Sequence, residues 1–140
     1  MIMSPGSCER MEPTQTSDEN PMLSGLIVDS VNVSRMIHTA VVHGCGFAAQ
    51  AVETGTQAVE LYVSGSRFDL VVLDISFSSE HPVETARKIR QIDPTVKMIG
   101  TTADSFHAES QGFLDAGGSA VFEKPLDLAT LSKVLEELGM

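Results

Sequence analysis

Five short apolar runs alternate with five segments of helical period along most of this 140-residue chain. The run at 69–73 is rich in valine and leucine, which is typical of a strand buried on both faces of a sheet. Because parallel strands need long crossover connections, the alternation predicts an α/β fold, a parallel five-stranded sheet with helices on both faces. The expected strands are 26–28, 47–52, 69–73, 96–100 and 119–122, and the expected helices are 33–42, 54–62, 82–92, 105–116 and 126–138.

Individual residues predict where two of the helices begin and which side of the first helix is apolar. Pro82 suits the first turn of the third helix, and Asp127 is expected to cap the last one. The first helix carries an apolar stripe at helical spacing, which we expect to pack in the core. This stripe consists of Val33, Met36, Ile37, Ala40 and Val41.

The composition changes near residue 23. Residues 1–23 hold three prolines, one arginine and four acidic residues among many small polar ones. Such a segment buries little apolar surface, so we expect a disordered acidic N-terminal tail. Residues 24–140 then form a single domain, the usual number for a chain of this length.

The composition of the chain argues against several classes of function. The chain has 9 basic and 19 acidic residues, a formal net charge of −10, which opposes binding to phosphate backbones. It has no apolar run near the ~20 residues that span a membrane, and its start lacks the pattern of a secretory signal. Two cysteines, Cys8 and Cys45, provide no framework of bridges, which favours a reduced intracellular setting. We therefore expect no direct contact with nucleic acid and no membrane span.

Polar side chains follow the predicted strands. Asp29 follows the first strand, Asp74 the third, Thr102 the fourth and Lys124 the fifth. The carboxyl ends of parallel strands meet at one edge of the sheet, where ligands bind. Two carboxylates suit Mg²⁺, and an ammonium beside them suits a phosphoryl group. Each residue alone is a weak signal, since an acid after a strand more often caps a helix, but together they predict phosphoryl transfer with a carboxylate nucleophile.

Residues 24–140 resemble the receiver domains of two-component response regulators. The resemblance implies a doubly wound, flavodoxin-like sandwich with strand order 2-1-3-4-5 and a cis peptide bond between Lys124 and Pro125. It rests on four motifs, at 26–30 with 34–35, at 68–74 with the helix after it, at 99–103 and at 122–126.

This resemblance also implies residue roles. Asp74 would accept a phosphoryl group from phosphohistidine, Thr102 would bond its oxygens and Lys124 would pair with it. Mg²⁺ would be held by Asp29, Asp74 and the backbone carbonyl of Ser76, with Ser30 as a further candidate ligand. The chain would not be a conventional enzyme, but at most an autophosphatase or a discharger of phosphohistidine.

The partners implied are a histidine phosphotransfer protein or a histidine kinase, with the chain itself a monomer or weak dimer. An acidic receiver that ends after its fifth helix is similar to the short, atypical plant response regulators, some of them linked to cytokinin phosphorelays. We therefore expect a stand-alone regulator in the cytoplasm, with the nucleus as a second location, that signals through protein contacts or acts as a phosphate sink.

Departures from the family motivate an alternative. Ser30 stands where the family has a second acid, Val121 where it has a switch aromatic, and Ser78 and His81 change the loop after Asp74. A phosphorylation-incompetent pseudo-receiver that acts as a protein-interaction module is therefore the second hypothesis. A flavodoxin-like binder of small molecules is a third, but no phosphate-cradling loop follows the first strand. The G-x-G-x-x-A string at 44–49 lies between a helix and a strand, the reverse of its dinucleotide-binding context.

Overall fold

The computed structural model of the chain describes residues 22–76, 80–103 and 109–140. Strands and helices alternate along these residues, as predicted. The strands are β1 (Ser24–Val28), β2 (Ala48–Val52), β3 (Leu70–Asp74), β4 (Lys97–Thr102) and β5 (Ala120–Glu123). The helices are α1 (Asn32–Gly44), α2 (Gly55–Val63), α3 (Pro82–Ile92), α4 (Glu109–Asp115) and α5 (Leu128–Glu137).

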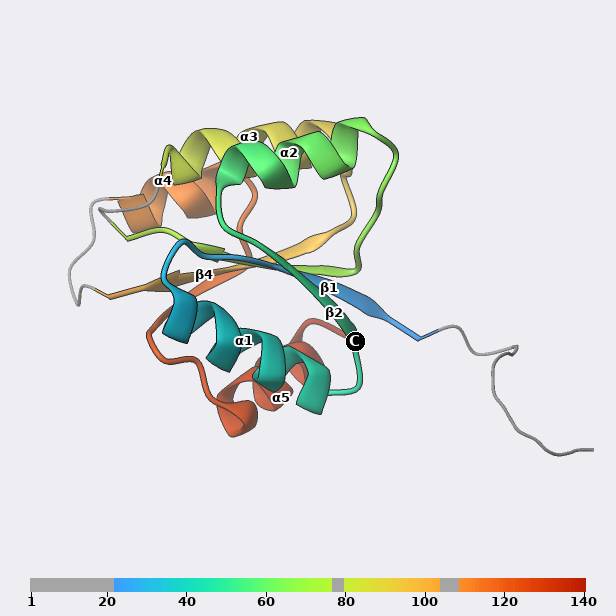
Figure 1. Cartoon of the computed structure of the whole chain (residues 1–140), viewed down its shortest axis with the longest axis vertical. Coiled ribbons are helices and arrows are strands. Elements are labelled where there is room, and N and C mark those ends of the chain that lie inside the picture. Colours follow the sequence, from blue (N-terminus) through green and yellow to red (C-terminus); the bar gives the residue numbers. More distant parts are fainter. Residues whose placement is uncertain (1–21, 77–79, 104–108) are drawn as a thin grey trace, which may run out of the picture.

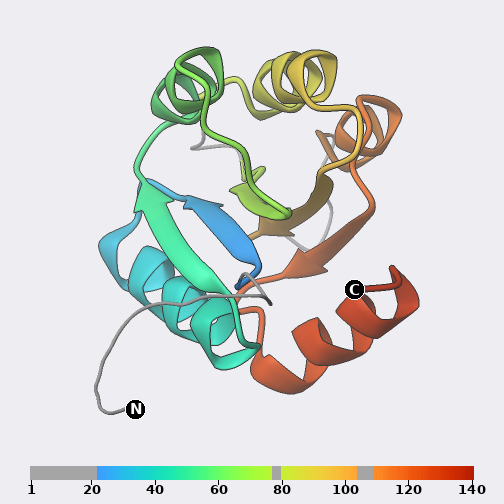
Figure 2. The ribbon, with the colours of Figure 1, turned by 90° about the vertical axis from the view of Figure 1, so that its right-hand side faces the viewer.

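The five strands form one parallel sheet in the order β2-β1-β3-β4-β5, so the expected flavodoxin-like topology is confirmed. Helices α2, α3 and α4 cover one face, and α1 and α5 cover the other (Figures 1 and 2). The three central strands consequently have both faces covered, which explains why β3 is buried along its whole length.

Two apolar clusters fill the spaces between the sheet and its helices. Leu26, Val71 and Met98 point to the α2–α4 side, where Phe113 of α4 packs against them. The alternate residues Ile27, Val72 and Ile99 point to the α1–α5 side. This alternation is the period of two that extended chains impose.

Local capping agrees with the sequence. Asp127 caps α5 by accepting a hydrogen bond from the Thr130 N–H at 2.7 Å, and Pro82 lies in the first turn of α3. Gly55, the first residue of α2, lies so close to α3 that a Cβ there would be 2.1 Å from Thr85 Oγ1. The Lys124–Pro125 peptide bond is cis, as the resemblance implies.

The predicted inner face of α1 is wrong for four of its five residues. Val41 packs against the core cluster on the α1–α5 side, whereas the exposed members of the predicted stripe are Val33, Met36, Ile37 and Ala40. The buried residues of this helix are His38 and Val42. The helix is rotated relative to our expectation because its inward side carries a polar side chain, His38, which contacts the Leu126 backbone N–H and lies near the Asp29 carboxylate.

Some predictions concern residues beyond the described part. The tail at 1–23 lies outside it except for Met22 and Leu23, and so do Ser78 and the first residues of the helix predicted at 105–116. Among the described residues, no helix combines the length and apolar character needed to cross a membrane.

Candidate functional site

Asp29 and Asp74 lie next to one another at the carboxyl edge of the sheet. Asp74 is the last residue of β3, and Asp29 directly follows β1. These strands pair in parallel with Val28 opposite Leu73, so the register carries the next residue of each strand to the same edge. Both carboxylates are buried, with 2% and 3% of the residue surface exposed. Two negative charges in such a place need positive partners.

Lys124 supplies that positive charge. It directly follows β5, and its Nζ lies 3.0 Å from Asp29 Oδ2 and 3.2 Å from Asp74 Oδ2. The side chain is 14% exposed, so the ammonium group is largely withdrawn from water. A single lysine thus bridges the two acids, as the convergence of strand ends predicted.

Donors from the start of α1 also hold Asp29 in place. Its Oδ1 accepts a hydrogen bond from the Val31 N–H at 2.9 Å, and its Oδ2 accepts one from the Ser34 hydroxyl at 2.6 Å. The guanidinium of Arg35 donates to the Asp29 carbonyl oxygen at 2.9 Å. These three hydrogen bonds fix the position of Asp29 at the edge of the sheet.

Asp74 is linked to the neighbouring loops. Its Oδ1 accepts a hydrogen bond from the Ser76 N–H at 2.9 Å, and the Ser76 hydroxyl accepts one from the Ala103 N–H at the same distance. Thr102, the last residue of β4, is buried one position beyond Thr101, which pairs with Asp74. The structure therefore gathers all the predicted strand-end residues at one edge, while their chemical roles stay predictions.

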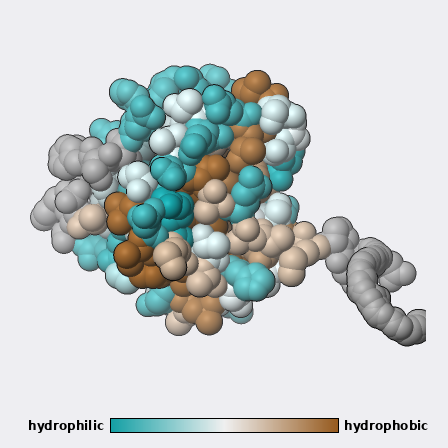
Figure 3. All heavy atoms as spheres, in the orientation of Figure 1, coloured by the Kyte–Doolittle hydropathy of each residue, from teal (hydrophilic) through white to brown (hydrophobic). Residues whose placement is uncertain are grey.

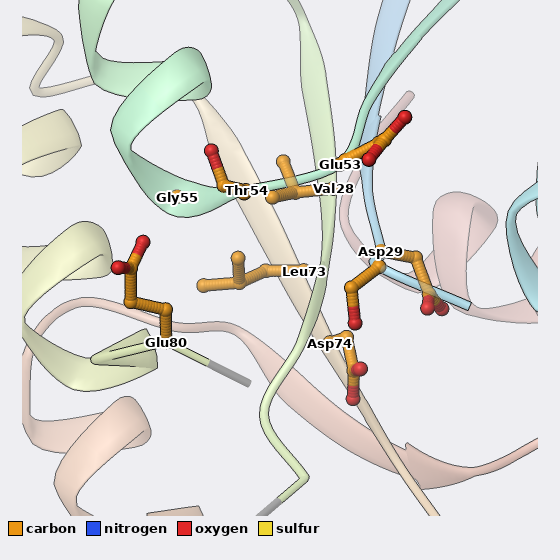
Figure 4. A pocket seen from close by; sticks show the side chains of 9 residues that line it. Val28, Asp29, Glu53, Thr54, Gly55, Leu73, Asp74 and Glu80 are labelled. Carbon is orange, nitrogen blue, oxygen red and sulfur yellow. The ribbon is translucent and has the colours of Figure 1, made fainter. Parts of the chain in front are cut away.

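A pocket of about 220 Å³ opens beside the two carboxylates (Figure 4). Asp29 and Asp74 lie together at one end of it, and Glu80 lies at the other. Glu53 and the exposed Ser30 also line it. A pocket with this many acids attracts cations and repels phosphate unless positive charge compensates.

The donor set fits a magnesium ion. Mg²⁺ is commonly bound through one or two carboxylates and keeps several waters, and Asp29 and Asp74 border a pocket with room for water. Within the described residues, no group of three or more His, Cys, Asp or Glu side chains gathers as a metal cluster. Ser30 has a neutral hydroxyl at the position where the family has a second acid after the first strand. Asp29, Ser30 and Asp74 therefore make a weaker set of magnesium ligands than three carboxylates would.

Of the residues that depart from the family, Ser30, His81 and Val121 lie within the described part of the chain. His81 is exposed and precedes α3 with a left-handed backbone (φ 46°), as a solvated loop residue. Val121 of β5 is partly buried against the α2–α4 core cluster and has neither a ring nor a hydroxyl to present.

The sequence pattern does not predict the contacts that two residues make with Asp29. Ser34 belongs to the motif at 34–35 without a role assigned to it there, and His38 lies among the residues of an apolar stripe. The available signal was the spacing of four from His38 to Val42, which puts the histidine on the buried side of the helix.

Comparison with known proteins agrees with this geometry. The model of the response regulator receiver domain matches residues 26–136. Two-component response regulator 24 of Arabidopsis thaliana is 28% identical over 134 residues, covering 92% of this chain and 96% of that protein. Two-component response regulator ORR42 of rice (Oryza sativa subsp. japonica) is 32% identical over 124 residues, covering 88% and 90%.

A solved structure shares the fold. The receiver domain of a sensor histidine kinase from Pseudomonas aeruginosa, which has a magnesium ion coordinated in its active-site cleft, superposes with a TM-score of 0.73. It is 24% identical, and the match covers 84% of this chain and 98% of that one.

The fold and the strand-end cluster together define a receiver-type α/β domain, with two acids and a lysine at the carboxyl edge of its sheet. The chain belongs to the response regulator receiver domain family.

Proposed function

We propose that the chain is a stand-alone receiver that accepts a phosphoryl group from phosphohistidine onto Asp74. The contact of Lys124 Nζ with both Asp29 and Asp74 carries this proposal, because it puts an ammonium beside a carboxylate that borders an open pocket. In phosphoryl transfer, catalysis rests on positioning and on neutralising charge that spreads over the phosphoryl oxygens.

The proposed reaction is a single displacement at phosphorus. A carboxylate oxygen of Asp74 forms a bond to phosphorus as the bond to the histidine nitrogen breaks, and the leaving imidazole keeps that electron pair. The product is an acyl phosphate. Lys124 pairs with the added negative charge and the Thr102 hydroxyl donates to a phosphoryl oxygen. Asp29, Asp74 and the Ser76 carbonyl would hold Mg²⁺, which would supply further charge neutralisation.

The proposed donor is a histidine phosphotransfer protein or a histidine kinase, within a His-to-Asp phosphorelay such as cytokinin signalling in the plant cytoplasm or nucleus. Likeness to response regulators of Arabidopsis and rice supports the plant setting. The output is a protein contact or the removal of phosphate from the donor, since hydrolysis of the acyl phosphate would regenerate Asp74.

Exposed apolar residues suit a protein donor. Val33 and Met36 are exposed residues of α1, the helix that starts beside the site. On the face of the molecule drawn in Figure 3, apolar surface gathers over the lower part. Met36, with Ala40 of the same helix and Ala51 of β2, also lines a shallow groove of about 430 Å³. Clustered apolar surface of this kind is typical of protein-binding sites.

A second candidate function is a pseudo-receiver that binds partners without accepting phosphate. Ser30 favours it, because its exposed hydroxyl replaces an acid at the pocket. Val121 also favours it, because a valine cannot report phosphorylation as a switch aromatic does.

Intact-mass measurement after incubation with a phosphorylated histidine phosphotransfer protein separates the two. The proposed function predicts a phosphoryl adduct, or Mg²⁺-dependent loss of phosphate from the donor, that disappears in Asp74→Asn. The exposed Asp115→Asn variant is the matched control and should behave as the wild type. An unmodified chain that binds a donor still carrying its phosphate would establish the pseudo-receiver.

A further inference from the structure

His38 lies on the inward side of α1, and its imidazole is buried beside Asp29, with 1% of the residue exposed. Its two ring nitrogens face different parts of the site. Nε2 is 3.1 Å from the backbone nitrogen of Leu126, and Nδ1 is 3.8 Å from Asp29 Oδ2. An apolar side chain would fill the same volume, so a buried imidazole here calls for a reason beyond packing.

The contact with Leu126 determines where the ring proton lies. A backbone N–H only donates, so Nε2 must accept with its lone pair, and the neutral ring carries its proton on Nδ1. That N–H faces the Asp29 carboxylate across a distance that is too long for a hydrogen bond but short enough for attraction. Burial lowers the pKa of His38 below its ordinary value, in keeping with a neutral ring.

Leu126 is two residues beyond Lys124, so the histidine holds the segment that carries the lysine. On the other side of this segment, the Lys124 N–H donates to the Thr102 carbonyl oxygen at 2.8 Å. The main chain around Lys124 is therefore fixed at two points, one on β4 and one on α1. A long lysine side chain reaches a fixed target best when its backbone does not move.

We propose that His38 is a positioning residue, whose imidazole holds the 124–126 segment so that Lys124 Nζ stays between Asp29 and Asp74. Its effect on phosphorylation rests on the function proposed above, whereas its tautomer and its hold on Leu126 do not.

Two variants separate positioning from packing. His38→Gln places an amide oxygen near the position of Nε2 and can still accept from the Leu126 N–H. His38→Leu fills the space but accepts nothing. Phosphoramidate serves as a small-molecule donor. We expect His38→Leu to lower the maximal rate of Asp74 phosphorylation roughly tenfold and to leave the half-saturating phosphoramidate concentration unchanged. This factor is the lower end of the losses seen when residues that orient the ligands of a metal site are replaced. His38→Gln should retain most of the rate. Equal rates in the wild type and His38→Leu would overturn the proposal.

Nuclear magnetic resonance tests the same proposal without any phosphodonor. Long-range ¹H–¹⁵N spectra of the wild type should show a protonated Nδ1 and an unprotonated Nε2. The Leu126 amide should exchange slowly in the wild type and in His38→Gln, and faster in His38→Leu. A proton on Nε2, or equal Leu126 exchange in all three proteins, would refute the hold. If neither the wild type nor any variant is phosphorylated but the spectra are as expected, the proposed function is wrong. The hydrogen bond between His38 and the Leu126 N–H is then still supported.

Discussion

The Ser76 hydroxyl accepts a hydrogen bond from the backbone N–H of Ala103 at 2.9 Å. This bond joins the loop after β3 to the end of β4. Since the Ser76 N–H also donates to Asp74 Oδ1, one residue connects the predicted phosphoacceptor to the neighbouring strand. Ser76 is buried, so water competes poorly for either bond.

Removing this hydroxyl should destabilise the domain. In Ser76→Ala the Ala103 N–H loses its acceptor, and we expect the free energy of unfolding to fall by about 0.5–1.5 kcal/mol, the usual net value of such a bond. Urea denaturation measures the change. Ser119→Ala, at an exposed position, is the control and should lie within about 0.5 kcal/mol of the wild type. A Ser76→Ala variant as stable as this control would show that solvent replaces the bond.

Restoring an acid at residue 30 should strengthen metal binding. Ser30 lines the pocket beside Asp29 and Asp74, so Ser30→Asp adds a carboxylate where the family carries one. We expect Mg²⁺ affinity, measured by calorimetric titration, to rise by roughly tenfold or more and phosphorylation to speed up. Ser30→Asn has a similar shape without the charge and should change little. Unchanged affinity in Ser30→Asp would mean that residue 30 does not face the metal.

The buried histidine should make stability depend on pH. Burial lowers the pKa of His38, so below its ordinary value of 6.5 the unfolded chain takes up a proton that the folded chain resists. The contribution of the neutral His38 to the free energy of unfolding is therefore fully present above pH 6.5. It is lost as the pH falls through the lowered pKa. The slope from one proton is at most about 1.4 kcal/mol per pH unit.

His38→Gln isolates this contribution from that of the carboxyl groups. Urea denaturation at about pH 7.5 and about pH 5.5, on either side of the ordinary histidine pKa, should show a smaller loss of stability in the variant than in the wild type. Identical losses in both proteins would indicate that His38 titrates in the folded domain as it does in an unfolded chain.

The sheet could be predicted because its strands are short apolar runs that differ in period from the helices. Val71, Val72 and Leu73 of β3 are buried although they point to alternate faces of the sheet. Few sequences place apolar residues at consecutive positions in this way by chance. Asp29, Asp74 and Lys124 were predictable for a related reason, since parallel topology brings strand ends together wherever the exact boundaries fall.

The partners of those residues were less predictable. The orientation of α1 brings His38 into contact with a backbone N–H 88 residues away, and no local period in the sequence contains such a contact. The apolar pattern favoured Met36 as a core residue, yet it is 71% exposed. Likewise, Ser76 is an ordinary loop serine until the fold brings Ala103 beside it.

The exposed side of α1 leads to the last prediction. If a protein donor docks on Val33 and Met36, Met36→Glu should bury a charge in that contact and slow transfer from a phosphorylated histidine phosphotransfer protein by roughly tenfold or more, as loss of a central interface residue does. Phosphorylation by phosphoramidate needs no docking surface and should keep its rate. Val63→Glu introduces the same charge at an apolar residue of α2, 73% exposed on the other side of the sheet, and should leave both reactions unchanged. Equal loss with both donors would mean that Met36→Glu disturbs the site itself, and no loss with either would move the docking surface away from α1.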